Sequence, residues 1–426
     1  MPRKSPEIQF FTDRPKLVAS RDQTVDLLIR VKAPEPEDNF DKGTASRPHL
    51  NLAVTLDRSG SMAGEKIVKA REAAAYCIEE LAATDRISLV IFDDVVETLV
   101  PSTLAANKSA ILERLPAITA RNSTALHEGW VRGGIQVSEH LTDGAINRVL
   151  LITDGRANAG LTNTDEIVSQ AMALAERGVT TSTIGIGDDF NEDLLLPMAK
   201  SAGGNAWHVQ KAGDLQSIFA VELEGLIAQA GHSVSLGLIP SDGVRLSDLL
   251  NDFEMNETGR YRLPNLQSGR TIDVVVQFRV PAQPVGARIR LVDLRLGYTR
   301  QDSTQAEVIK QFFEIGFDSE REVERLQTNP EVAAAVQLLM NARARREAVK
   351  RVDAGDYSGA AAVVAGAHAA TQALFQAHPC SAPLQEEMGA LNDLSGNLAE
   401  PAQAKMNRKR LAYGAHHLSY NNRRQS

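Results

Sequence analysis

The stretch Asp57-Arg58-Ser59-Gly60-Ser61 decides how this sequence is interpreted. It follows an apolar run over residues 49–56 and precedes an amphipathic segment that begins near residue 64. One carboxylate and two hydroxyls at alternating positions of a turn can bring their oxygens to one point, and Gly60 permits the tight turn this needs. Small oxygen ligands with little net charge suit Mg2+, which prefers an octahedron of oxygens and keeps some of its waters. The stretch therefore predicts a cation site at the carboxyl end of a strand.

Residues 49–231 alternate between strand-like and helix-like periods. The predicted strands cover residues 49–56, 86–92, 95–100, 148–153, 180–187 and 205–210. The run 148–153 is nearly all apolar, as is typical of a central parallel strand buried on both faces. Asp93-Asp94 looks like a tight turn into an antiparallel edge strand. This pattern predicts an α/β domain with a doubly wound, mostly parallel, six-stranded Rossmann-like sheet.

Three separate loops of this sheet carry small oxygen-bearing side chains. In an open α/β sheet, ligands bind outside the carboxyl ends of the strands where the strand order reverses. The first strand ends at Asp57 and the fourth ends at Asp154, while Asn122-Ser123-Thr124 begins a helix on the same rim. We expect the oxygens of these loops to converge. The predicted set is Asp57, Ser59, Ser61, Thr124 and Asp154.

With these pieces in place, residues 49–231 resemble a von Willebrand factor type A (VWA) domain with a complete metal-ion-dependent adhesion site (MIDAS). The pieces that carry the resemblance are Asp57-Arg58-Ser59-Gly60-Ser61, Thr124 in Asn122-Ser123-Thr124-Ala125-Leu126, and Asp154 in Thr153-Asp154-Gly155. The resemblance implies that Ser59 and Ser61 bind the metal directly, that Thr124 binds it directly or through water, and that Asp57 and Asp154 often act through water. It implies Mg2+, with Mn2+ or Ca2+ as alternatives, and a protein partner that presents Asp or Glu to the metal.

The same stretch has a simpler interpretation. Asp-x-Ser-x-Ser alone could be a turn with a helix N-cap, since Ser and Asp favour both. The order and spacing of Thr124 and Asp154 favour the metal site.

The rest of the chain predicts further domains. Strand-like runs lie in residues 1–48, an antiparallel β-sandwich pattern covers 232–317, and helical patterns cover 318–404. The N-terminal strands have no partners nearby, and an isolated hairpin is marginal in water. We therefore expect them to join the sandwich, with the α/β domain inserted between. Residues 405–426 hold six Lys or Arg and no acid, which predicts a basic, disordered tail.

Composition narrows the function classes. The 426 residues are 43% hydrophobic and 23% charged, which is the globular range. A formal charge of −8 argues against a general nucleic-acid binder, although the basic tail leaves contact with nucleic acid, an acidic partner or a membrane surface open. Two cysteines, Cys77 and Cys380, fit a reducing compartment. No apolar run approaches the roughly 20 residues of a membrane helix, and no signal peptide is visible, so we expect a cytoplasmic protein.

These observations favour a metal-dependent protein-interaction module, a scaffold or adaptor, and not an enzyme. The layout is similar to that of bacterial intracellular proteins in which a type A domain stands beside β and helical segments. The alternative is an accessory subunit of an AAA+ ATPase machine of the chelatase or cofactor-assembly kind. A free-standing hydrolase is the weakest hypothesis, because nothing near the predicted site supplies a nucleophile and a base.

Overall fold

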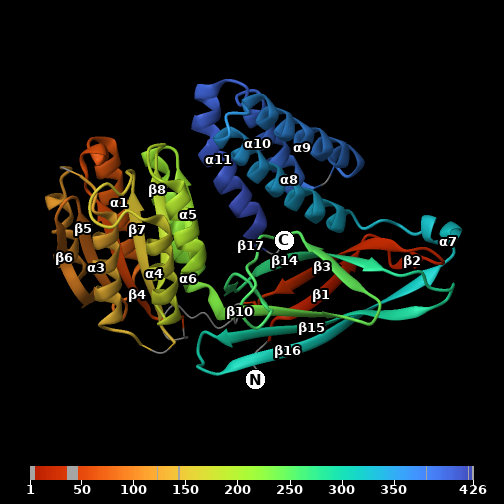
Figure 1. The fold of residues 1–426 in the computed structure, drawn as a ribbon. Helices are drawn as coiled ribbons and strands as arrows, with labels where there is room; N and C mark the ends of the chain where they lie inside the picture. The colour runs from red at the N-terminus through yellow and green to blue at the C-terminus, as the bar shows by residue number, and fades with distance from the viewer. Residues whose placement is uncertain are drawn as a thin grey trace. The chain divides into compact units, whose positions relative to one another are not determined.

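The computed structural model of the protein describes residues 5–35, 47–121, 123–142, 144–379, 381–420 and 422–424. These residues form two compact units (Figure 1). The α/β unit holds the described residues of 38–229 together with 301–304, and the sandwich–helix unit holds those of 1–37, 230–300 and 305–426. Asn122 and Cys380, named above, lie outside the described residues.

The α/β unit is built on a sheet with the strand order β6-β5-β4-β7-β8-β9. All neighbouring strands are parallel except β5 and β6, which pair antiparallel. This confirms the predicted doubly wound, mostly parallel sheet with one antiparallel edge. The strands are β4 (Leu50–Asp57), β5 (Arg86–Phe92), β6 (Val96–Leu104), β7 (Ile146–Thr153), β8 (Thr180–Ile186) and β9 (Gly203–Val209).

Helices cover both faces of this sheet. Side chains from α1 (Glu65–Glu80), α2 (Lys108–Leu112) and α6 (Leu215–Ile227) share one apolar core with alternate residues of β4. The other face carries α3 (Leu126–Ser138), α4 (Thr164–Glu176) and α5 (Glu192–Ser201). On that face α3 lies very close to the sheet: a Cβ on Gly133 would be only 2.3 Å from Thr55 Oγ1, so the close approach requires glycine at this position.

Strand order also places the reversal point of the sheet where the sequence predicted it, between β4 and β7. Strands β4 and β7 are neighbours, paired from Leu50↔Ile146 to Leu56↔Ile152. The chain leaves β4 towards α1 on one face and leaves β7 towards α4 on the other, so the loops diverge at the carboxyl ends of these two strands. Such a divergence is where open α/β sheets bind ligands.

The second unit contains the predicted β-sandwich, with both chain ends contributing strands. One sheet has the order β1-β3-β14-β11, and β17 also pairs with β14; the other has the order β12-β10-β15-β16-β2, and β13 also pairs with β10. Most pairs are antiparallel, but the short β2 runs parallel to β16. The strands are β1 (Glu7–Thr12), β2 (Lys16–Val18), β3 (Gln23–Lys32), β10 (Gln229–Pro240), β11 (Arg245–Leu249), β12 (Tyr261–Arg262), β13 (Leu266–Gln267), β14 (Arg270–Val280), β15 (Arg288–Arg300), β16 (Ala306–Asp318) and β17 (Asn422–Arg424).

The N-terminal strands complete this sandwich across a long stretch of sequence. Strand β3 pairs along its whole length with β14, from Lys32↔Thr271 to Gln23↔Val280. Strand β1 pairs with the other edge of β3. The α/β domain is therefore inserted between strands of one sheet, as the partnerless N-terminal runs predicted.

The helices described after the sandwich in the same unit are α7 (Glu320–Glu324), α8 (Pro330–Asp353), α9 (Tyr357–Ala377), α10 (Ala382–Ser395) and α11 (Pro401–Tyr420). Asn329 caps α8 by accepting a hydrogen bond from Glu331 N, and Pro330 occupies the first turn. Val332, Ala335 and Leu339 of α8 pack on the sandwich residues Leu28, Leu250 and Val275. The helical region thus shares an apolar core with the sheet.

The prediction of a disordered tail is wrong for residues 405–420, which lie in α11. Leu411, Tyr413 and Ala415 are buried there. Arg408 donates hydrogen bonds to Asp353 of α8 at 2.7 and 2.9 Å. The apolar residues and the ion pair together hold the basic segment on the helical region.

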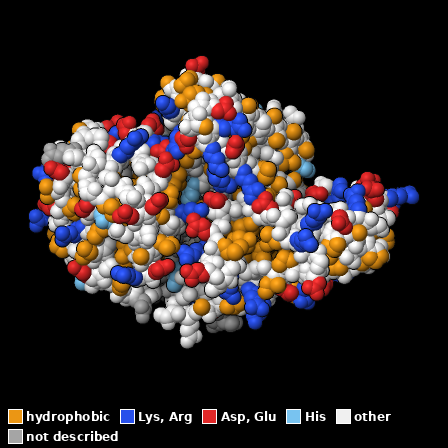
Figure 2. Space-filling view, viewed as in Figure 1, with side chains coloured by type: hydrophobic (Ala, Val, Ile, Leu, Met, Phe, Trp, Pro, Cys, Tyr) orange, Lys and Arg blue, Asp and Glu red, His pale blue; other side chains and the backbone are white. Residues whose placement is uncertain are grey.

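The described helices include none that is both long and apolar enough to cross a membrane. Figure 2 shows Lys and Arg side chains interspersed with Asp and Glu over the face in view.

Candidate functional site

The first loop of the candidate site begins at the buried carboxyl end of β4. Asp57 is the last residue of the strand and is fully buried. Its Oδ1 accepts a hydrogen bond from Ser59 N at 2.7 Å, and its Oδ2 accepts one from Thr153 Oγ1 at 2.5 Å. These bonds fix both carboxylate oxygens. The short helix Gly60–Met62 then turns the chain, so that the hydroxyls of Ser59 and Ser61 lie 3.1 Å apart.

The second loop begins where β7 ends. Asp154 is fully buried, and its Oδ1 accepts a hydrogen bond from Ser61 Oγ at 2.7 Å. Its Oδ2 accepts one from Lys66 Nζ at 2.5 Å. The two loops are therefore connected through the side chains of Ser61 and Asp154.

The third loop brings Thr124 to the same rim. Thr124 is 3% exposed, and its backbone N donates to Asn158 Oδ1 at 2.8 Å. Its carbonyl oxygen accepts from Asn158 N and Ala159 N, at 3.2 and 3.3 Å. The next residue, Ala125, donates its N–H to the carbonyl oxygen of Asp93 at 2.7 Å. Thr124 is thus held between the loop after β7 and the turn after β5.

One point beside Gly155 shows how closely the three loops meet. A Cβ placed on Gly155 would lie 3.2 Å from Thr124 Oγ1, 3.7 Å from Asp57 Oδ2 and 3.7 Å from Ser61 Oγ. Through Ser61, the oxygens of Ser59 and Asp154 join the same cluster. The structure therefore brings together all five residues that the sequence singled out.

The charges in this cluster are unevenly balanced. Asp154 faces the ammonium of Lys66, but the partners of Asp57 are the neutral donors Thr153 Oγ1 and Ser59 N. Burial raises the pKa of Asp57 to about 6, although these hydrogen bonds act in the opposite direction. An ionised carboxylate out of reach of water is costly without a cation. A positive charge placed here would stabilise the ionised form of Asp57.

Hydroxyl groups would have to supply part of any metal shell. Among the described residues, no group of three His, Cys, Asp or Glu side chains is placed to hold a metal ion. The oxygens of Ser59, Ser61 and Thr124 are hard, neutral ligands of the kind that Mg2+ accepts. Four of the five residues are buried, and Ser61 is exposed, so the cluster opens to solvent at Ser61.

Several residues that orient or charge the site were not predicted as part of it from the sequence, among them Thr153, Lys66 and Asp93. Thr153 orients Asp57, and Lys66 pairs with Asp154. Asp93, interpreted above only as part of a turn, accepts from Val95 N at 2.7 Å and forms ion pairs with Arg58 and Arg121. Lys66 carried a signal, since side chains in the first turn of a helix lean towards its N-terminus and hence towards the rim. The two arginine partners of Asp93 come from loops distant in sequence, and no local pattern indicated these ion pairs.

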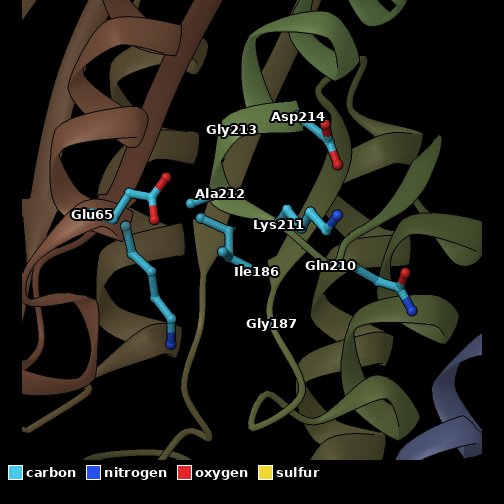
Figure 3. Close-up of a pocket in the computed structure, with 9 residues that line it drawn as sticks. Glu65, Ile186, Gly187, Gln210, Lys211, Ala212, Gly213 and Asp214 are labelled. Carbon is cyan, nitrogen blue, oxygen red and sulfur yellow. The ribbon is translucent and has the colours of Figure 1, made fainter.

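A pocket of about 480 Å³ adjoins the cluster. It is lined by Glu65, Lys66, Ile186, Gly187, Gln210, Lys211, Ala212, Gly213 and Asp214. Figure 3 shows Glu65 facing Ala212 and Ile186 across the pocket. Lys66 lines the pocket and also contacts Asp154, so the pocket and the oxygen cluster share a wall.

The strand order defines an open α/β domain, and the oxygen cluster lies at the point where that order reverses. Residues 51–221 match the model of the von Willebrand factor type A domain, so the chain contains a VWA domain. Domains of this family generally serve as protein-interaction modules and are generally not enzymes.

Curated relatives match the VWA region. The chain is 28% identical over 191 residues to the uncharacterized protein sll0103 of Synechocystis sp., covering 45% of this chain and 44% of that protein. It is 27% identical over 196 residues to the uncharacterized protein YfbK of Escherichia coli, covering 46% of this chain and 34% of that protein. The chain therefore spans less than half the length of each of these relatives.

A solved structure is similar over the whole chain. The structure described as von Willebrand factor type A from Catenulispora acidiphila has a TM-score of 0.69 at 16% identity, covering 100% of this chain and 99% of that one. The likeness shows a shared fold that includes the sandwich and helices.

Proposed function

We propose that Asp57, Ser59, Ser61, Thr124 and Asp154 hold one divalent cation, and that this cation binds an acidic side chain of a protein partner. The protein would act as a scaffold or adaptor whose affinity for its partner depends on the bound metal. Mg2+ is the first choice because the available ligands are hard oxygens. Mn2+ and Ca2+ accept the same ligand types and remain alternatives.

The observation that carries the proposal is the cluster around Gly155. Oxygens from three loops lie within 3.2–3.7 Å of one point, and a glycine leaves that point free of side-chain atoms. Among the described residues, the hydrogen-bond donors to the buried Asp57 carboxylate are neutral, so a cation would also offset the cost of its ionisation. The oxygen donors and the charge of the cluster both suit a hard divalent cation.

The same set of ligands explains why the partner should present an acidic group. With hydroxyls and water in its first shell and the two carboxylates acting through water, the cation would stay incompletely neutralised and could attract another anion. The exposed Ser61 marks the side from which a visiting carboxylate would approach. Partner recognition through such a contact agrees with the general role of VWA domains.

A binding experiment on the full chain tests the proposal. Mn2+ titrated by calorimetry should bind the wild type at one site, and Mg2+ should compete. Asp57→Ala should lose at least about tenfold in affinity, a difference of roughly 1.4 kcal/mol. The control Asp94→Ala removes an exposed carboxylate near the rim and should bind as the wild type does. Equal affinity in Asp57→Ala and wild type would contradict the site.

The partner is tested by affinity purification of wild type and Asp57→Ala, each in Mg2+ and in chelator. Proteins bound only by the wild type in Mg2+ are candidates, and direct titration of each purified candidate must reproduce the metal dependence. Recovery of an AAA+ ATPase would favour the accessory-subunit alternative. An identical partner set in all four conditions would remove the metal-dependent proposal.

A further inference from the structure

The candidate site contains a positive charge of its own. Lys66 Nζ lies 2.5 Å from Asp154 Oδ2, and the Lys66 side chain is 28% exposed while that of Asp154 is fully buried. Asp154 uses its other oxygen, Oδ1, to accept from Ser61. One carboxylate therefore faces the hydroxyl cluster with one oxygen and an ammonium with the other.

The surrounding backbone leaves room for this ammonium. Gly187, just after β8, has φ +71°, and a Cβ there would lie 3.7 Å from both Cε and Nζ of Lys66. Lys66 belongs to the first turn of α1, whose side chains lean towards the rim. The lysine thus reaches Asp154 from the side of the adjoining pocket.

Other charged groups line that pocket, but they are exposed. Glu65, Lys211 and Asp214 all face solvent, and they contribute charges of both signs. Charges in water are strongly screened compared with a pair made to a buried carboxylate. The Lys66–Asp154 pair is therefore the contact in this pocket that bears most directly on the cluster.

A charge count shows the consequence. Asp57 and Asp154 together balance a divalent cation, and Lys66 then leaves the loaded site with one net positive charge. Repulsion between the ammonium and the metal opposes cation binding, while both positive groups attract an anion. The same residue should therefore act in opposite directions on the two ligands.

We infer that Lys66 determines the specificity of the site. It lowers the affinity of the empty site for the cation and raises the affinity of the cation-loaded site for a carboxylate. The inference rests on the proposed function. The cation would then be bound by this chain and by the partner together, and its affinity would be higher when an acidic group of the partner is present. Linkage requires this coupling to be reciprocal, so a carboxylate should tighten the cation by the same factor.

The test compares Lys66→Met with Lys69→Met. Lys69 lies on the same helix and is held by Glu72 at 2.8 Å, so the control makes the same charge change away from the cluster. Two probes are used on the full chain. Mn2+ alone is titrated by calorimetry, and acetate is titrated onto the Mn2+-loaded protein while water proton relaxation reports on the metal.

Lys66→Met should bind Mn2+ more tightly than the wild type by about tenfold, and its Mn2+-loaded form should bind acetate more weakly by a similar factor. Lys69→Met should match the wild type in both titrations. Lys66→Arg, which keeps the charge, should restore the wild-type behaviour. Thermal unfolding without metal shows whether each variant is folded, and Lys66→Gln serves in place of Lys66→Met if the latter is not.

The outcomes separate this inference from the proposed function. If the wild type binds no Mn2+, the cation site itself fails and the inference falls with it. If the wild type binds Mn2+ but Lys66→Met has unchanged affinity for Mn2+ or for acetate, the role of Lys66 alone is wrong.

Discussion

Asp93 Oδ2 accepts a hydrogen bond from Arg121 Nε at 2.5 Å, and this pair joins the turn after β5 to the loop that carries Thr124. The same oxygen lies 3.1 Å from Nε of Arg58, a residue of the loop that carries Ser59 and Ser61. Hydrogen bonds from Val95 N and ion pairs with the two arginines outweigh burial and lower the pKa of Asp93. One ionised carboxylate therefore holds two of the three site loops together.

We expect Arg121→Gln to weaken cation binding several-fold, because Thr124 would lose a tie to the other loops. Arg121 is exposed, and Asp93 would still form its ion pair with Arg58 in the variant. The thermal midpoint of unfolding should therefore stay close to that of the wild type. Mn2+ calorimetry and thermal unfolding measure the two effects. Arg114→Gln, on the exposed surface of the preceding segment, is the control. Wild-type affinity in Arg121→Gln would show that the tie has no role in the site.

Gly155→Ala should reduce cation affinity by about tenfold or more. Its methyl group would stand 3.2 Å from Thr124 Oγ1 and 3.7 Å from Asp57 Oδ2, in the space that the cation is proposed to use. Gly213→Ala is the matched control, since a Cβ there meets no atom within 4 Å. Mn2+ titration compares the two variants. Undiminished binding by Gly155→Ala would place the cation elsewhere.

A buried ion pair in the α/β unit predicts a pH dependence of stability. Glu222 and Arg148 lie 2.9 Å apart, both almost fully buried, and Ser182 also donates to Glu222 at 2.6 Å. Burial alone would raise the pKa of Glu222, but the charge of Arg148 and the hydrogen bonds lower it below its usual 4.5. A carboxyl whose pKa is lowered by folding stabilises the native state above its unfolded pKa. This contribution is lost as the pH falls below about 4.5.

Glu222→Gln should lower the free energy of unfolding by about 3–5 kcal/mol at pH 7, because it leaves Arg148 buried without a counter-charge. The difference from the wild type should shrink as the pH falls below 4.5. Urea unfolding at a series of pH values measures both. The control Glu224→Gln changes an exposed residue of the same helix and should have little effect. A constant difference across the pH range would contradict the argument.

The helical region contains a second buried pair, Arg345 and Glu387, with two hydrogen bonds of 3.0 Å from Arg345 Nη2 to the carboxylate. Burial raises the pKa of Glu387 even though Arg345 opposes this. Glu387→Leu alone should cost about 3–5 kcal/mol, while the double variant with Arg345→Met should recover most of that loss. Denaturant unfolding of the four proteins in this cycle gives the coupling. If the double variant were as unstable as Glu387→Leu, the stability of the helical region would depend on the two charges themselves.

The basic segment shows why one prediction from the sequence was wrong. The basic charge of residues 405–426 indicates a disordered tail, but Ala404, Leu411, Ala415 and Leu418 recur at nearly helical spacing. The structure pairs Arg408 with Asp353 and places Gly414 against the guanidinium of Arg345, so that α11 packs on α8. Neither partner could be identified from local sequence.

The sequence by itself determined the strands and helices of the α/β domain and the five oxygen-bearing residues at its rim. Periodicity is a local property, and the carboxyl ends of neighbouring parallel strands must meet at one edge of a sheet. Only the tertiary structure decided which side chains form hydrogen bonds and ion pairs with those five residues. Thr153 reaches Asp57 across 96 positions and Lys66 reaches Asp154 across 88, and such pairings depend on strand order and on where a helix begins in space. The residues that set charge and orientation at the site are therefore decided by packing, because contacts between distant segments leave no periodic trace in the chain.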